Sequence, residues 1–140
     1  MFILDTDPVS LWLRGHPLVK ERTVQAGPNV ATTVVTVQEL FNGWAGRINN
    51  LAQQETLVFA YTNLWKTIDF IQQFPVANFD QSADNFYVNL LEMNVDLRKK
   101  KLRQDVRIAA IVLSLNATVV TRNRKDFSLI LGLSIVDWSV

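Results

Sequence analysis

Short apolar runs that alternate with longer, helix-patterned segments restrict the folds open to this chain more than any other feature. The runs cover residues 2–4, 30–35, 74–76, 118–120 and 133–136. They are too short for typical helices and suit strands buried on both faces. Between them, the pattern predicts helices that begin near Asp5 and Thr36, a helical or irregular stretch at 17–26, and helices over 54–73, 81–94, 104–115 and 124–131. This order predicts a single domain over residues 1–140, of three-layer α/β/α architecture, with a short, mainly parallel sheet of four to five strands.

The residue types that are missing exclude several classes of function. The chain has no cysteine, which excludes disulfides, a thiol nucleophile and a cysteine zinc site, and its one histidine, His16, lies in a turn context. Neither GxxxxGK[ST] nor GxGxxG occurs, which weighs against nucleotide-phosphate binding of those kinds. The opening residues do not resemble a signal peptide, and the longest apolar stretches are about half of the roughly 20 residues that a membrane span needs. We therefore expect a soluble, cytoplasmic protein without a membrane partner.

The net charge of +1 hides an asymmetry along the chain. Residues 1–97 carry five basic and ten acidic side chains, whereas residues 98–140 carry nine basic and three acidic ones. The basic excess lies in two clusters, which are Arg98, Lys99, Lys100, Lys101, Arg103 and Arg107, and then Arg122, Arg124 and Lys125. Such clusters suit a patch for a polyanion or, equally, a solvated helix end and a solvated loop.

Acidic and amide side chains follow the ends of the predicted strands. Asp5 comes directly after the first strand, Glu39 follows the second, and Asp105 opens the helix before the fourth. Asn123 and Asp126 come after the fourth strand. Because ligands of parallel α/β sheets bind beyond the carboxyl ends of the strands, we expect these groups to face one crevice. Converging carboxylates repel one another unless a cation joins them, and Mg²⁺ or Mn²⁺ suits such a site and activates water for attack on a phosphodiester.

Each of the three main acids also has a structural explanation. Asp5 suits a helix cap, Asp105 suits the N-terminus of its helix, and Glu39 would complete a capping box with Thr36. Taken singly, these structural roles explain each acid better. Taken together, three acids at corresponding positions of the topology favour a metal site.

Motifs in a fixed order cover nearly the whole chain. They are Leu4-Asp5-Thr6-Asp7 with LWLRG at 11–15, TVQEL at 36–40, Phe79-Asp80 with Ala83, DVRIAA at 105–110, TRNRKDF at 121–127, Gly132-Leu133 and Asp137-Trp138. In order and spacing, this set resembles the PIN-domain family and, within it, the VapC toxins of type II toxin–antitoxin systems. The resemblance implies a PIN-like fold and a Mg²⁺- or Mn²⁺-dependent endoribonuclease that cleaves RNA phosphodiester bonds with a metal-activated water.

The same resemblance assigns the main site residues. Asp5, Glu39 and Asp105 are the core acids, with Asp5 and Asp105 expected to hold the metal ion. The family's fourth acidic position falls on Asn123, which offers an oxygen or an amide donor but no charge. Asp126 lies near enough to serve in its place, or else caps the following helix.

Supporting roles are expected for three further residues. Thr6, Asp7 and Thr121 are predicted to hydrogen-bond to the site. Asp7 suits a helix cap better, and Thr121 is also an ordinary residue for a strand end.

The resemblance also implies partners. Family members are usually homodimers, and a cognate antitoxin holds them inactive with a segment laid across the active-site groove. The expected RNA contacts come from Arg14, Arg103, Arg107, Arg122 and Arg124. One alternative is a PIN-fold RNA-binding or regulatory protein with weak or no nuclease activity, which Asn123 favours. A flavodoxin-like signalling domain is the other, but no Asp at the end of a central third strand pairs with a later Lys.

Overall fold

The sheet is parallel throughout. The computed structural model describes residues 1–52 and 54–140. Within them the strands are β1 (Phe2–Leu4), β2 (Val30–Thr33), β3 (Val76–Ala77), β4 (Thr118–Val120) and β5 (Ser134–Val136), in the spatial order β3-β2-β1-β4-β5. Leu4 of β1 lies opposite Thr32 of β2 and Val120 of β4. The carboxyl ends of the three central strands therefore meet at one edge of the sheet.

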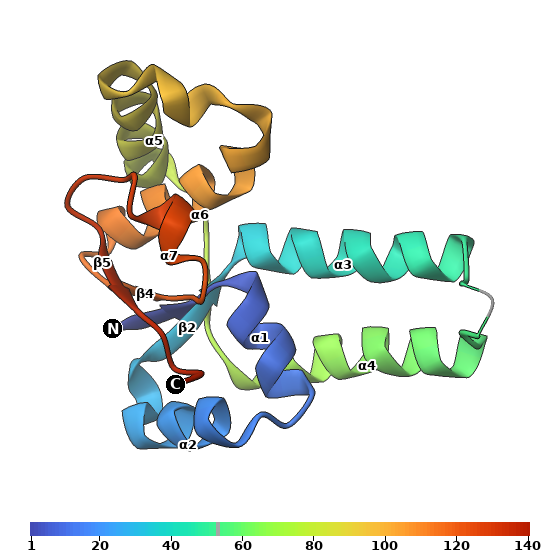
Figure 1. The fold of residues 1–140 in the computed structure, drawn as a ribbon. Coiled ribbons are helices and arrows are strands. Elements are labelled where there is room, and N and C mark those ends of the chain that lie inside the picture. Colours follow the sequence, from blue (N-terminus) through green and yellow to red (C-terminus); the bar gives the residue numbers. More distant parts are fainter. Residues whose placement is uncertain (53) are drawn as a thin grey trace.

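Helices connect the strands and lie on both sides of the sheet (Figure 1). They are α1 (Thr6–Leu13), α2 (Pro17–Ala26), α3 (Val34–Asn49), α4 (Leu57–Gln73), α5 (Gln81–Met93), α6 (Arg103–Ser114) and α7 (Arg124–Phe127). Short 3₁₀ helices cover Gly27–Asn29, Val95–Arg98 and Lys100–Leu102. Among the residues that the structure describes, none of the helices combines the length and the apolar character that crossing a membrane requires.

Neighbouring residues of one strand enter different cores. Ile3 and Val119 pack with α5, α6 and α7, whereas Leu4 and Val120 pack with α1, α2 and the last part of α4. This follows from the alternation of side chains along a strand, because each central strand carries apolar side chains on both faces. The predicted three-layer α/β/α architecture is confirmed. The sheet has five strands, where four to five were predicted.

The α3–α4 hairpin projects from the body of the protein (Figure 1). We call residues 41–52 and 54–69 of this hairpin the arm. Its large apolar side chains are mostly solvent-exposed: Val58 is 77% exposed and Trp65 is 65% exposed. Phe70, at the base of the arm, is fully buried and stacks on Phe74 with ring centroids 4.6 Å apart.

Several predicted element boundaries are wrong. β2 ends at Thr33, whose Oγ1 accepts a hydrogen bond from the Thr36 backbone N–H at 3.1 Å, so α3 begins two residues earlier than expected. The capping box predicted for Thr36 does not form, because Thr36 is a buried residue within the first turn. The third strand lies at Val76–Ala77, since Phe74 packs against the aromatic rings of the body. The last helix is α7 alone, which ends at Phe127 and not at 131.

Candidate active site

Asp5 leaves β1 directly into the edge of the sheet. Its backbone N–H donates to the Val120 carbonyl at 3.0 Å, which extends the β1–β4 pairing by one residue. Its side chain is 5% exposed and makes no capping hydrogen bond to α1, although Asp5 occupies the N-cap position. The Thr121 hydroxyl donates to Asp5 Oδ2 at 2.9 Å. The carboxylate is thus directed toward the end of β4 by a hydrogen bond from Thr121, whose role in a functional site stays a prediction.

Glu39 reaches the same edge from α3. The Thr6 hydroxyl donates to Glu39 Oε1 at 2.7 Å, which ties the first residue of α1 to the second turn of α3. This bond takes the place of the capping box that the sequence suggested. Thr6 thus makes a hydrogen bond to one of the three acids, and its supporting role in a functional site stays a prediction.

An amide links the remaining acids. Asn123 Nδ2 donates to Asp105 Oδ2 and to Asp126 Oδ2, each at 3.1 Å. The backbone N–H of Asn123 donates to Thr121 Oγ1 at 3.0 Å, and Thr121 in turn holds Asp5. Asn123 and Asp126 thus both lie at the site, and the amide works as a donor between two carboxylates.

Burial and mutual repulsion raise the pKa values of these acids. Desolvation, followed by the charges of Glu39 and Asp7, raises the pKa of Asp5 to about 6, against the opposing effects of the nearby Thr6 backbone N–H and of the hydrogen bond from the Thr121 hydroxyl. Desolvation and the charges of Asp5, Glu39 and Asp126 raise the pKa of Asp105 to about 7. Burial also raises the pKa of Glu39. The charge of Glu39 thus affects the pKa values of both Asp5 and Asp105, although the three residues come from segments far apart in the chain.

The donor chemistry of this cluster fits a hard divalent cation, but the side chains are not already arranged around one. Carboxylate and amide oxygens are the ligands that Mg²⁺ and Mn²⁺ take, and a cation would relieve the repulsion that raises the pKa of Asp105. In the described part of the chain, however, no three acidic, histidine or cysteine side chains stand close enough together to hold a metal ion. Each carboxylate is instead hydrogen-bonded to its own Thr or Asn neighbour. Metal binding would therefore require these side chains to reorient.

Asp7 and Arg122 form an ion pair that sequence reasoning missed. Arg122 Nε and Nη2 donate to the two Asp7 carboxylate oxygens at 2.6 and 2.7 Å. Within the described chain, Asp7 therefore makes no capping hydrogen bond to α1 and no hydrogen bond to the other acids, and Arg122 is engaged within the chain. The signal was available, because opposite charges follow the ends of two neighbouring strands, β1 and β4.

The other arginines expected to contact RNA are spread over the surface. Arg14, Arg103 and Arg124 are exposed, at the end of α1, the start of α6 and the start of α7. Arg107 is half-buried, and among the described residues its side chain makes one hydrogen bond, to Gln104 Oε1 at 3.4 Å.

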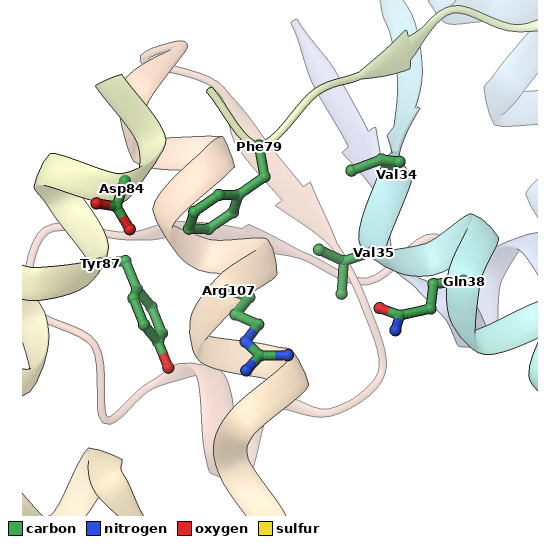
Figure 2. A pocket seen from close by; sticks show the side chains of 7 residues that line it. All are labelled: Val34, Val35, Gln38, Phe79, Asp84, Tyr87 and Arg107. Carbon is green, nitrogen blue, oxygen red and sulfur yellow. The ribbon is translucent and has the colours of Figure 1, made fainter. Parts of the chain in front are cut away.

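Two of the hollows on the described surface are lined in part by α3, one by its first two turns and one by its later turns. One, of about 480 Å³, lies between α3, α5 and α6, beside β3 (Figure 2), and is lined by Val34, Val35, Gln38, Phe79, Asp84, Tyr87 and Arg107. The other lies between α1, α3 and α4, has a volume of about 440 Å³, and is lined by Ser10, Leu13, Arg14, Leu40, Trp44, Arg47, Phe59 and Asn63. A smaller hollow continues the second one as far as Glu39. Sequence reasoning identified neither, because their walls come from segments with no shared motif.

Comparison with known proteins relates this fold to solved complexes. No family model and no curated protein matches the chain. Among solved structures, it is similar to a chain of the DNA-bound VapBC from Salmonella typhimurium (24% identity, 98% of this chain and 97% of that chain, TM-score 0.78) and of VapBC-1 from nontypeable Haemophilus influenzae (22%, 99% and 98%, 0.79). It is also similar to VapBC-5 from Mycobacterium tuberculosis, a member of the VapBC family of toxin–antitoxin systems (22%, 96% and 96%, 0.67). The predicted PIN-like fold and the resemblance to VapC toxins are thereby confirmed at the level of the fold.

Proposed function

We propose that this chain is the toxin of a type II, VapBC-like toxin–antitoxin pair and that it is a metal-dependent endoribonuclease. The observation that carries the proposal is the meeting of Asp5, Glu39 and Asp105 at the carboxyl edge of the sheet, where burial and then the charges of neighbouring acids raise the pKa values of Asp5 and Asp105. The shared fold with VapBC chains over nearly the whole length supports the same conclusion.

Asp5 and Asp105 would hold Mg²⁺ or Mn²⁺, with Glu39 and Asn123 completing the site. When bound, the cation supplies charge stabilisation for the phosphodiester and a lowered pKa for the attacking water. Asn123 contributes no charge, and its amide would present its oxygen to the cation after giving up its bonds to Asp105 and Asp126.

The residues of the chain itself orient the acids. Thr121 donates to Oδ2 of Asp5 and so fixes that carboxylate at the end of β4. Thr6 engages Oε1 of Glu39, and Oε2 makes no hydrogen bond within the described chain, so Oε2 is the oxygen that would accept a proton from water. Burial raises the pKa of Glu39, which makes it a better proton acceptor than an exposed Glu.

RNA would approach over the basic C-terminal part of the chain. Residues 98–140 carry nine of the basic side chains and three of the acidic ones. Arg103 and Arg124 are exposed on the first turns of α6 and α7, the helices that carry Asp105 and Asp126, and would attract phosphates to this side of the protein. Arg122 already pairs with Asp7 and would contribute less.

The second hollow, with the exposed arm beside it, is the proposed contact for a cognate antitoxin. Its wall combines apolar rings with two arginines, and the Arg47 guanidinium lies 4.9 Å from the centre of the Trp44 ring. Because a smaller hollow extends it to Glu39, a segment bound there would reach the acids. The protein would act as a homodimer, as expected from the family resemblance.

The test is RNA cleavage by the purified protein in Mg²⁺ or Mn²⁺, beside the Asp5→Asn and Asp105→Asn variants. We expect cleavage that chelator abolishes, at least about a 100-fold loss in either variant, and weaker Mn²⁺ binding by calorimetry. Asp69→Asn, on an exposed part of α4, is the matched control and should cleave like the wild type. Equal cleavage by the wild type and the Asp5→Asn variant would contradict the assignment. RNA binding without cleavage would favour the alternative of an RNA-binding or regulatory protein, which is also the alternative that the uncharged Asn123 favours.

A further inference from the structure

We propose that the hollow between α3, α5 and α6 is a base-binding subsite that receives a guanine of the RNA next to the cleaved bond. This inference rests on the proposed nuclease function, which it extends to sequence preference. The lining residues come from three separate parts of the chain and face a common space (Figure 2).

The position of the hollow connects it to the acids. Gln38 lines the hollow and is the chain neighbour of Glu39 on α3. Arg107 lines it from α6, two residues after Asp105. Two of the helices that carry the acids therefore also form walls of the hollow. A nucleotide next to the scissile phosphate would have its base within reach of this space.

The aromatic and aliphatic walls suit the faces of a base. Phe79 and Tyr87 pack edge to face, with ring centroids 5.8 Å apart and an interplanar angle of 78°. Val34 and Val35 lie across the hollow from them (Figure 2). Bases of single-stranded RNA are commonly bound by stacking on such rings. The volume of about 480 Å³ is within the range of small-molecule sites.

The polar groups of the hollow select guanine among the four bases. Within the described chain Arg107 makes no ion pair, and its single side-chain hydrogen bond, to Gln104, is long. Its guanidinium group, which lies between Tyr87 and Gln38 in Figure 2, is thus available for the O6 and N7 acceptors of guanine. Asp84, on α5, has a carboxylate that can accept from the N1–H and N2–H donors of the same base. No other base offers two adjacent acceptors to an arginine and two adjacent donors to a carboxylate.

The separation of Asp84 and Arg107 argues against a purely structural role for these two charges. Opposite charges that served only to join α5 to α6 would form an ion pair, and these two do not come within ion-pair distance of each other in the part of the chain that is described. They line the same hollow from different helices and leave space between them.

The first experiment measures binding without metal. GMP, AMP, CMP and UMP are each titrated into the isotope-labelled full chain and followed by NMR. All four carry the same phosphate, so any difference in affinity reports the base. We expect GMP to bind tightest, with shifts at α5 and α6, and Arg107→Ala to weaken GMP binding about tenfold or more. Lys66→Ala, which removes the same charge from an exposed position on α4, should leave GMP binding unchanged.

Further variants separate recognition from folding. Asp84→Asn keeps the shape of the hollow but removes an acceptor, and should reduce the preference for GMP over AMP. Equal binding of all four nucleotides, or unchanged GMP binding by Arg107→Ala, would overturn the proposal. A Tyr87→Ser variant that turns a dimer into a monomer in sedimentation, with GMP binding intact, would also overturn it and would identify the hollow as an interface between two copies of the chain.

Cleavage of a randomised RNA library then distinguishes this proposal from the proposed function. Sequencing of the products is expected to show guanine enriched at one position beside the cut, and Arg107→Ala is expected to lose that enrichment. A wild type that cuts RNA without enrichment would refute the guanine subsite and leave the nuclease function intact. A wild type that binds GMP selectively but cuts no RNA would refute the nuclease function, and with it the place of the base beside a cleaved bond, but would leave the hollow as a guanine-binding site.

Discussion

The body around α6 and the arm use apolar residues in opposite ways. In α6, residues Ile108 to Val112 are fully buried between the sheet and the neighbouring helices. In the arm, α4 is also rich in apolar residues, yet its Val58, Tyr61 and Trp65 are each more than half exposed. The sheet covers α6 and does not extend over the arm (Figure 1). An exposed apolar surface of this kind indicates a binding partner, whereas the buried one fixes the positions of the acids.

The largest effect is expected where the body packs beneath the site. Phe127, at the end of α7 and next to Asp126, is fully buried. Phe127→Ala should lower the free energy of unfolding by about 3–5 kcal/mol, because it removes a whole ring from a closed core. Urea unfolding followed by circular dichroism measures this. If the free energy of unfolding fell by less than about 1 kcal/mol, the body would tolerate a cavity as well as the exposed arm does. That result would contradict the difference in packing between the two regions.

The next effect concerns the contact that holds Asp5. Thr121→Val keeps the shape of the side chain but removes the hydroxyl that donates to Asp5 Oδ2. We expect Mn²⁺ affinity and RNA cleavage to fall about 10- to 100-fold, as for other residues that orient metal ligands. Thr121→Ser, which restores the donor, should recover most of the loss. Thr118→Val, at the other end of β4, is the control, and a similar loss there would assign the effect to the strand and not to the hydroxyl.

A smaller effect follows from the raised pKa values of the acids. Asp5 and Asp105 have folded-state pKa values of about 6 and about 7, above the ordinary Asp value of 3.8. The folded protein therefore holds these protons more tightly than the unfolded chain does. Stability from this source is fully present below the ordinary value and is lost as the pH rises through the raised values.

The metal-free protein should accordingly melt a few degrees lower at pH 8 than at pH 5, and Mg²⁺ should reverse the loss at pH 8. Differential scanning calorimetry with and without chelator measures both. Asp105→Asn, which cannot ionise, should flatten the pH dependence. If that variant shows the same slope as the wild type, the acids are not the source of the effect.

The part of the site that follows from strand topology was predictable from sequence. Asp5, Asp105 and Asn123 each stand at the end of a strand or at the start of a helix, and a parallel sheet brings such positions to one edge. The strand alternation that predicts this sheet is a local pattern. Glu39 was also identified, but the sequence left open that it only completes a capping box with Thr36. The structure excludes that alternative, because Thr33 is the residue that caps α3.

The remainder depends on which surfaces meet, and periodicity carries no such information. The stripe of apolar residues in 54–73 predicted a helix with one apolar face, but it could not tell whether the sheet would cover that face. The Asp7–Arg122 pair and the hollow around Arg107 join segments that lie far apart in the chain. Each needs the packing of two helices or strands before its residues become neighbours.

The smallest effect is expected for Trp65, the most exposed ring of the arm. In a core, Trp→Ala removes about 3–5 kcal/mol of stability, but Trp65 is 65% exposed, so Trp65→Ala should change the free energy of unfolding by no more than about 0.5 kcal/mol. Urea unfolding of the chain alone tests this, and the same variant in complex with a cognate antitoxin tests the role of the surface. A loss near the core value in the isolated chain would mean that the arm is packed like the body. A negligible loss in isolation with weakened antitoxin binding would show that the arm holds its apolar residues for a partner.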